Sequence, residues 1–294
     1  MPRAVLIYNP AAGSHDVGRL VVQVDRQLSR AGFSVDAQAT SGAGNAEHLA
    51  RSAAQEEVSA LFVCGGDGSL RECAAGLLGT PTPLGFIPCG TANVMARVLR
   101  LPSNAVAAAA ALACGKVTAL DVGLCNDRPF LMQASAGLDA EILRRAKPSR
   151  KRFLGRGEIA LAALSGWYSY QYPEFEVSWA GSRRFATFAA ICNIPFYGGG
   201  WRMAPGARWD DSRLDLVLFS GSARVATLGF ARDLAVTRHT RRSDVKCIQI
   251  EEATISATPG LNLQLDGDFM PAQLPARLRL ASQQVRFLVP SRST

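Results

Sequence analysis

The chain has 294 residues, of which 48% are hydrophobic and 19% charged, and its formal net charge is +8 at pH 7. This composition excludes disordered and fibrous proteins and is typical of a globular protein with one large or two ordinary domains. The longest run of small apolar residues, 105–114, has only about half of the ~20 residues that a membrane-spanning helix needs, and the apolar stretch 4–8 is too short for a secretion signal. We therefore expect a cytoplasmic protein.

The first 120 residues alternate between strand and helix patterns. Apolar runs typical of strands lie at 4–8, 33–39, 59–64 and 84–87, and apolar residues at helical spacing follow at 17–28, at 46–55, from Ser69 onward and at 93–99. Repeated strand–turn–helix units predict a parallel sheet with helices on both faces. Ligands of such sheets bind at the carboxyl ends of the strands.

After about residue 121, short strands dominate the pattern. They are predicted at 121–125, 129–134, 174–179, 184–193, 214–219, 245–250, 253–257, 261–265, 277–281 and 284–288, with helices at 158–169 and 223–238. Asn126-Asp127 between the first two strands indicates a hairpin. The sequence therefore predicts two domains: an α/β domain over 1–120 and a β-rich, sandwich-like domain over 121–294, whose last residues can pack back on the first domain.

Three turns that contain glycine or proline follow predicted strands of the first domain. They are Asn9-Pro10-Ala11-Ala12-Gly13-Ser14, Gly65-Gly66-Asp67-Gly68-Ser69 and Pro88-Cys89-Gly90-Thr91-Ala92-Asn93. Glycine lets the backbone approach a ligand closely, and a helix start offers free N–H groups to an anion, so three such turns at one sheet edge predict a phosphate site. Asp67 would repel a phosphate unless a metal ion or a reacting hydroxyl lay between them; the alternative is an ordinary Asp-Gly turn.

These turns resemble the catalytic domain of the diacylglycerol kinases, and in particular bacterial lipid kinases of the YegS/BmrU type, with sphingosine and ceramide kinases as more distant relatives. The resemblance continues into the second half of the chain. It includes Tyr197-Gly198-Gly199-Gly200, the segment Asp210-Asp211-Ser212-Arg213-Leu214-Asp215, and Asp266-Gly267-Asp268, where the family has Asp-Gly-Glu. The resemblance implies an ATP-dependent lipid kinase with a nucleotide-binding first domain and a lipid-binding second domain.

The resemblance also implies a role for each matching residue. ATP would be bound by Asn9, Pro10, Gly13, Thr40, Gly65, Gly66, Asp67, Gly68, Ser69, Glu72, Gly90, Thr91 and Asn93. Asp268 would be the catalytic base at the lipid hydroxyl, with Asp266 beside it. A structural Mg²⁺ would lie at Asp211 with the carbonyls of Arg208 and Arg213, and a catalytic Mg²⁺ would bridge the phosphates and Asp67.

Four residues depart from the family pattern and keep other functions open. Ser69 replaces Thr, Arg71 replaces Asn, Val94 replaces Asp, and Asp268 replaces Glu. One alternative is a kinase of a soluble metabolite, since NAD kinases and phosphofructokinases share the Gly-Gly-Asp-Gly turn. The other is a regulator that binds a nucleotide or lipid and has lost catalysis. The lipid also stays open: diacylglycerol, phosphatidylglycerol, a sphingoid base and a polyprenol all fit.

Basic residues are concentrated in one segment. Between Arg144 and Arg156 there are seven basic residues and no acidic ones: Arg144, Arg145, Lys147, Arg150, Lys151, Arg152 and Arg156. A solvated loop, a nucleic-acid patch and a membrane patch are the three interpretations, and no nucleic-acid motif accompanies the segment. We expect it to bind the anionic inner face of the membrane peripherally. The oligomeric state is left open.

Overall fold

A computed structural model describes residues 1–13, 16–146, 156–198, 200–257, 261–271 and 273–291, without the side chains of 156–160. It divides the chain into two compact units, residues 1–120 with 282–294 and residues 121–281. Each unit has its own hydrophobic core. Among the described residues, no helix has the length and apolar character that crossing a membrane requires.

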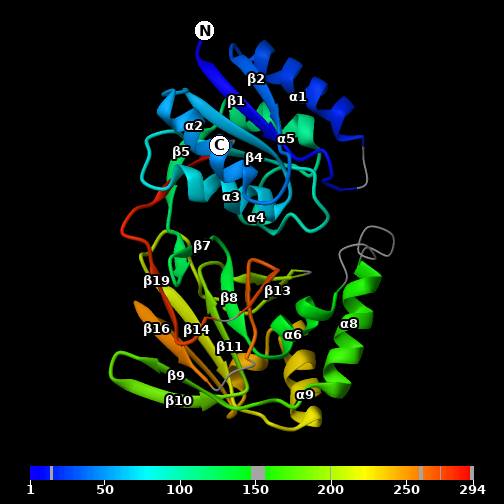
Figure 1. The fold of residues 1–294 in the computed structure, drawn as a ribbon, viewed down its shortest axis with the longest axis vertical. Coiled ribbons are helices and arrows are strands. Elements are labelled where there is room, and N and C mark those ends of the chain that lie inside the picture. The colour runs from blue at the N-terminus through cyan, green and yellow to red at the C-terminus, as the bar shows by residue number, and fades with distance from the viewer. Residues whose placement is uncertain (14–15, 147–155, 199, 258–260, 272, 292–294) are drawn as a thin grey trace. The chain divides into compact units, whose positions relative to one another are not determined.

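The first unit is an α/β layer structure (Figure 1). Its elements are β1 (Arg3–Tyr8), α1 (Val17–Arg30), β2 (Ser34–Ala39), α2 (Asn45–Gln55), β3 (Ala60–Gly65), α3 (Asp67–Leu77), β4 (Leu84–Pro88), α4 (Val94–Val98), α5 (Ala105–Ala113), β5 (Lys116–Leu120) and β20 (Val285–Val289). They form one sheet in the order β2-β1-β3-β4-β20-β5. All neighbours are parallel except β20 and β5, so the predicted parallel sheet is confirmed.

Helices cover both faces of this sheet. Leu6 of β1 and Phe62 of β3 share a core with Val24 of α1 and Leu112 of α5. Neighbouring strand residues point the opposite way, toward α2 and α3. These two helices pack closely because α3 has Gly76 at the contact: a Cβ there would lie 2.4 Å from the Glu47 carbonyl oxygen of α2.

The last strand belongs to the first unit. β20 pairs with β5 over its whole length, from Val285 opposite Leu120 to Val289 opposite Lys116, and also contacts β4 through Phe287. The chain therefore leaves the first sheet after β5, builds the whole second unit, and returns to finish the same sheet.

The second unit contains two six-stranded sheets and three α-helices among its described residues. Its elements are β6 (Gly123–Cys125), β7 (Arg128–Phe130), β8 (Gln133–Ala136), α6 (Leu138–Arg145), α8 (Arg156–Ser169), β9 (Phe175–Trp179), β10 (Ser182–Ala186), β11 (Phe188–Cys192), β12 (Phe196–Tyr197), β13 (Trp201–Arg202), β14 (Leu214–Phe219), α9 (Arg224–Ala235), η1 (His239–Arg241), β15 (Val245–Ile250), β16 (Glu252–Ser256), β17 (Leu263–Leu265), β18 (Asp268–Met270) and β19 (Ala276–Leu280). The sheets run β10-β9-β16-β19-β6-β7 and β15-β14-β11-β8-β17-β18.

A shared core confirms the predicted sandwich. It combines Val177 and Ile255 of the first sheet with Ile191 and Leu216 of the second. Two predicted strands, 184–193 and 129–134, are wrong, because each spans two strands of different sheets: Thr187 separates β10 from β11, and residues 131–132 separate β7 from β8. The Thr187 N–H donates to the carbonyl oxygen of Phe219 at 2.9 Å and its hydroxyl to that of Gly221 at 2.8 Å, and the chain passes from one sheet to the other at this residue.

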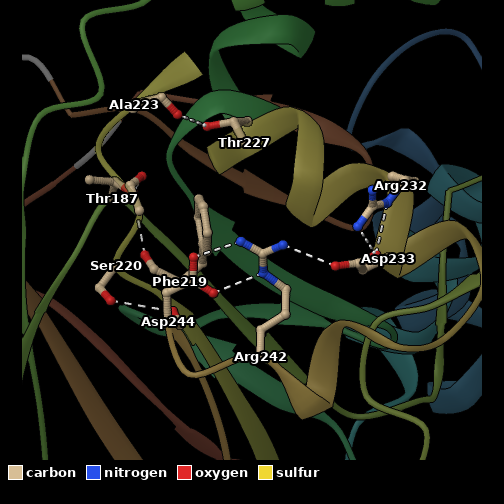
Figure 2. A network of polar contacts seen from close by, with 10 residues as sticks. Thr187, Phe219, Ser220, Ala223, Thr227, Arg232, Asp233, Arg242 and Asp244 are labelled. Atoms are coloured by element: carbon tan, nitrogen blue, oxygen red, sulfur yellow. Dashed lines mark hydrogen bonds and ion pairs between the residues drawn. The ribbon is translucent and has the colours of Figure 1, made fainter. Parts of the chain in front are cut away.

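Helix α9 covers the outer face of the second sheet. Alternate residues of β14 point outward, and Phe219 stacks on Phe230 of α9 with ring centroids 4.6 Å apart. Figure 2 shows how Arg242 holds the helix in place: the guanidinium bonds both carboxylate oxygens of Asp244 and reaches Asp233 of α9 at 2.9 Å. Apolar packing and this ion-pair network therefore fix α9 from its inner side.

Candidate active site

The predicted phosphate-binding turns meet at one edge of the first sheet. The Asn9 N–H donates to the carbonyl of Cys64 at the end of β3, at 3.2 Å, and the Thr40 N–H donates to the carbonyl of Tyr8 at 2.8 Å. The N–H groups of Cys89 and Gly90 both donate to Gly65, at 2.9 and 3.1 Å. The ends of β1, β2, β3 and β4 are thus tied together through the backbone.

Glycines are required where these turns touch. A Cβ on Gly90 would lie 2.6 Å from the Cα of Gly66. Gly13 has φ +66°, and a Cβ there would lie 2.2 Å from the Cys89 carbonyl oxygen. Only glycine fits such backbone-to-backbone contacts, so the sequence pattern correctly marks a place where three turns pack without side chains between them.

Asp67 links the turn after β3 to the next helix. Its carboxylate accepts hydrogen bonds from the Val94 N–H at 2.9 Å and the Met95 N–H at 3.1 Å, which are the first residues of α4. Helix α3 begins at Asp67 with Gly66 as its N-cap, so the predicted helix start at Ser69 is wrong by two residues. Ser69 lies in the first turn of α3, and a Cβ on Gly65 would meet its side chain at 2.8 Å.

The other expected ATP residues divide into two groups. Pro10 and Thr91 are exposed at this edge, and Gly68 lies in the first turn of α3. Asn93 and Glu72 instead bond to the protein. The Asn93 side chain closes its own turn through both polar groups of Gly90, and the Glu72 carboxylate accepts from the Ala46 N–H at the start of α2, at 3.2 Å.

Asp266 and Asp268 have different surroundings in the second unit. The Asp266 carboxylate is buried and accepts three backbone N–H groups, from Leu131 at 2.7 Å, Met132 at 2.8 Å and Gln133 at 2.9 Å. Asp268 is exposed at the first position of β18. A buried carboxylate with three donors organises the backbone, whereas an exposed one can meet a substrate. Of the two carboxylates, only that of Asp268 is exposed to solvent.

A buried polar network behind this hairpin does not stand out in the sequence. Gln264 accepts from the Gly267 N–H at 2.8 Å and donates to Ser135 and Asp139. The Asp139 carboxylate also bonds Ser135 and the Tyr197 hydroxyl, and desolvation raises the pKa of Asp139. This network holds the turn that carries Asp268. The Gly-x-Asp pattern at 137–139, between a strand and a helix, is the signal that could have marked it.

The expected magnesium residues lie together in the loop before β14. Asp211 accepts from the Arg213 N–H at 3.1 Å and from Gln249 at 3.2 Å, while the Arg208 guanidinium pairs with Asp210. In the part of the chain that the structure describes, no three acidic, His or Cys side chains cluster as a metal site.

A second carboxylate in this region bears on the magnesium prediction. Asp215 has one buried oxygen without a hydrogen-bond partner among the described residues, and its pKa is raised to about 6 by desolvation and by Asp211. Two carboxylates that repel each other, one with an unpartnered oxygen, fit a hard divalent cation.

The basic segment is described only in part. Arg144 and Arg145 both pair with the buried Glu141, at 2.7 and 2.6 Å. Lys147, Arg150, Lys151 and Arg152 lie outside the described residues, as does the side chain of Arg156. Arg144 and Arg145 therefore share one carboxylate partner within the fold, which offsets one of the seven basic charges.

Two family models match this chain, one over most of the first unit and one over most of the second. Residues 3–125 match the family described as the diacylglycerol kinase catalytic domain, and residues 132–289 match the YegS C-terminal NAD kinase beta sandwich-like domain. Proteins named diacylglycerol kinase from Staphylococcus carnosus and Bacillus subtilis are 28% and 27% identical, over 98% and 92% of this chain and 95% and 90% of their own length.

Solved structures share the fold over the whole chain. A diacylglycerol kinase from Bacillus anthracis superposes with a TM-score of 0.76 at 19% identity, covering 100% of this chain and 98% of the other. Another structure from the same organism reaches a TM-score of 0.84 at 22% identity, covering 100% and 97%. With the matched segments spanning both units, the chain belongs to the diacylglycerol kinase family, in its YegS-type branch.

Proposed function

We propose that this protein is an ATP-dependent lipid kinase, which transfers the γ-phosphate of ATP to a hydroxyl group of a membrane lipid. The observation that carries the proposal is the contact between Gly66 and Gly90, which brings the turns after β3 and β4 together with only backbone between them. Relatives named diacylglycerol kinase support a lipid acceptor, and diacylglycerol is therefore the first acceptor to test.

The first unit carries the proposed nucleotide-binding residues. The first N–H groups of α3 have no partners within the helix, and the positive end of the helix dipole favours phosphate. Asp67 stands in the same turn and is oriented by the two N–H groups of α4. Backbone donors can thus hold the phosphates while the carboxylate orders the cation that accompanies them.

The second unit carries the proposed catalytic base. The Asp268 carboxylate takes the proton from the lipid hydroxyl as the hydroxyl oxygen forms its bond to the γ-phosphorus. The bond from that phosphorus to the β–γ bridging oxygen breaks, and ADP leaves with the electron pair. Asp266 and Gln264 hold the hairpin in position through Leu131–Gln133 and Gly267.

Magnesium would have two places in this scheme. Mg²⁺ that arrives with ATP neutralises phosphate charge when it is bound, and Asp67 is the carboxylate on this chain that would meet it. Asp211, with the carbonyl oxygens of Arg208 and Arg213, would hold the second ion. The repulsion between Asp211 and Asp215 supports this assignment, because a cation would relieve it.

Transfer of labelled phosphate from ATP to a panel of acceptors tests the proposal. The panel contains diacylglycerol, phosphatidylglycerol, a sphingoid base and a polyprenol in mixed micelles, with NAD in solution. We expect label in one lipid and a loss of ~10²–10⁴-fold with Asp268→Asn. Asp127→Asn is the matched control, because Asp127 is exposed in another hairpin of the same unit. Label in none of the lipids would refute the proposal.

A kinase of a soluble metabolite is the second candidate. The family matched by residues 132–289 is described as NAD kinase-like in its β sandwich, and this observation alone favours it. Label in NAD but in no lipid would establish this candidate instead. Nucleotide binding without transfer to any acceptor would favour a regulator that has lost catalysis.

A further inference from the structure

Two neighbouring helices of the second unit expose large apolar side chains. Leu161, Leu164 and Tyr168 of α8 and Val225 and Leu228 of α9 are each between 51% and 79% exposed. Single exposed apolar residues are ordinary, but a group of five on two helices that contact each other is of the kind that marks a partner. We call these five residues the α8–α9 apolar face.

The two helices are in direct contact and turn this face outward. The Trp167 indole N–H donates to the Arg224 carbonyl at 3.2 Å, and the Arg224 guanidinium lies over the Tyr168 ring, 5.0 Å from its centroid. Ala162 and Phe230 are buried on the opposite sides of α8 and α9. Figure 1 shows α8 and α9 at one side of this unit. The apolar face is therefore the side that the fold leaves uncovered.

Basic residues lie beside this face in the sequence, and one of them, Arg232, is paired with Asp233 at 2.9 Å. Residues 161–173 and 224–232 contain no carboxylate, whereas Arg224 and Arg232 flank the apolar residues of α9. Arg145 reaches the exposed Ser165 of α8 at 3.1 Å. Just before and at the start of α8, residues 144–156 contribute seven basic residues and no acidic one.

We propose that the α8–α9 apolar face is a membrane-docking surface that inserts into the interfacial region of an anionic bilayer. This inference deepens the proposed function and rests on it, because a lipid substrate must be reached at the bilayer. Apolar side chains flanked by arginines, with a tyrosine among them, match the apolar and anionic layers of a membrane surface. A second copy of this chain would instead place arginines against arginines, which costs binding energy.

Vesicle co-sedimentation tests the docking surface. The probes are neutral phosphatidylcholine vesicles and vesicles in which about 30 mol% is phosphatidylglycerol, at low and high salt. We expect binding to the anionic vesicles, at least ~10-fold weaker in a Leu161→Gln, Leu164→Gln double variant and in a Val225→Gln, Leu228→Gln double variant. Phe185→Gln is the matched control, because Phe185 is 60% exposed on β10 of the same unit, and its binding should equal that of the wild type.

Activity on a short-chain diacylglycerol in solution separates folding and function from docking. Both double variants should phosphorylate this soluble acceptor like the wild type. Wild-type binding to vesicles by either folded double variant would overturn the docking surface, and so would a wild-type dimer that the variants convert to monomers. If the wild type binds vesicles but phosphorylates no lipid, and the variants bind vesicles more weakly, the docking surface would be supported and the proposed kinase function refuted.

Discussion

Asp266→Asn tests how the hairpin between β17 and β18 is held. The native carboxylate accepts the Leu131 N–H on one oxygen, and the Met132 and Gln133 N–H groups on the other. Asparagine keeps one oxygen, which can still accept from Met132 and Gln133. Its NH₂ group then faces the Leu131 N–H, so that two donors oppose each other inside the protein.

The cost follows from these contacts. An unsatisfied buried donor costs about 1–3 kcal/mol, and the two remaining hydrogen bonds lose the strength that the charge gives them, about 1 kcal/mol together. We therefore expect Asp266→Asn to lower the free energy of unfolding by about 3 kcal/mol. At about 2–4 °C per kcal/mol for a domain of this size, Tm should fall by roughly 6–12 °C.

Thermal unfolding followed by circular dichroism, with turnover measured well below Tm, checks this prediction. Asp268→Asn is the comparison: its side chain is exposed, so Tm should hardly move while turnover falls by ~10²–10⁴-fold. An unchanged Tm for Asp266→Asn together with complete loss of turnover would refute the reasoning. If Asp268→Asn were also fully active, the two residues would have exchanged roles.

Three further predictions concern other contacts of the site and fold. Gly90→Ala places a Cβ 2.6 Å from Gly66 and separates the two turns, so KM for ATP should rise at least ~10-fold in steady-state assays; an unchanged KM would contradict the assignment. Asp67→Asn should cut turnover at least ~100-fold while circular dichroism stays native, and near-normal turnover would exclude Asp67 from the chemistry. The hydrogen bond from Arg144, with help from Arg145, lowers the pKa of Glu141 to about 2, so its stabilisation is fully present above pH ~4.5, declines below that value and is lost as the pH falls through about 2. In urea unfolding at pH 7, the free energy of unfolding of Glu141→Gln should be about 2 kcal/mol lower than that of the wild type. This difference should shrink toward pH 2, and a constant difference would refute this pairing.

The sequence pattern predicts the strands and helices of the first unit well, because the burial of each element follows one regular pattern along its whole length. β3 is buried throughout and reads as a continuous apolar run, and α1 buries Val17, Val21, Val24 and Leu28 at helical spacing. The glycines of the turns are also predictable, since contact between two backbones leaves no room for a side chain. These features follow from interactions close in sequence.

Features that depend on distant partners are not predictable in this way. α6 buries Asp139 and Glu141, although charged residues of a helix are expected at the surface. They are buried because Gln264 bonds to Asp139, and Arg144 and Arg145 bond to Glu141. The different roles of Asp266 and Asp268 depend on the backbone of Leu131–Gln133, more than a hundred residues away. Likewise, the pattern at 284–288 predicts a strand but not the sheet that it joins.

The position of β20 has a consequence for the newborn chain on the ribosome. In the described sheet, β5 pairs only with β20, and β20 separates it from β4. Both β4 and β5 are translated before residues 121–281, and β20 only afterwards. At about 5–20 residues per second, the ribosome spends on the order of ten seconds or more on that interval. Throughout it, the open edge of β4 is a template for intermolecular pairing, so nascent-chain chaperones matter most to the part of this protein that is made first.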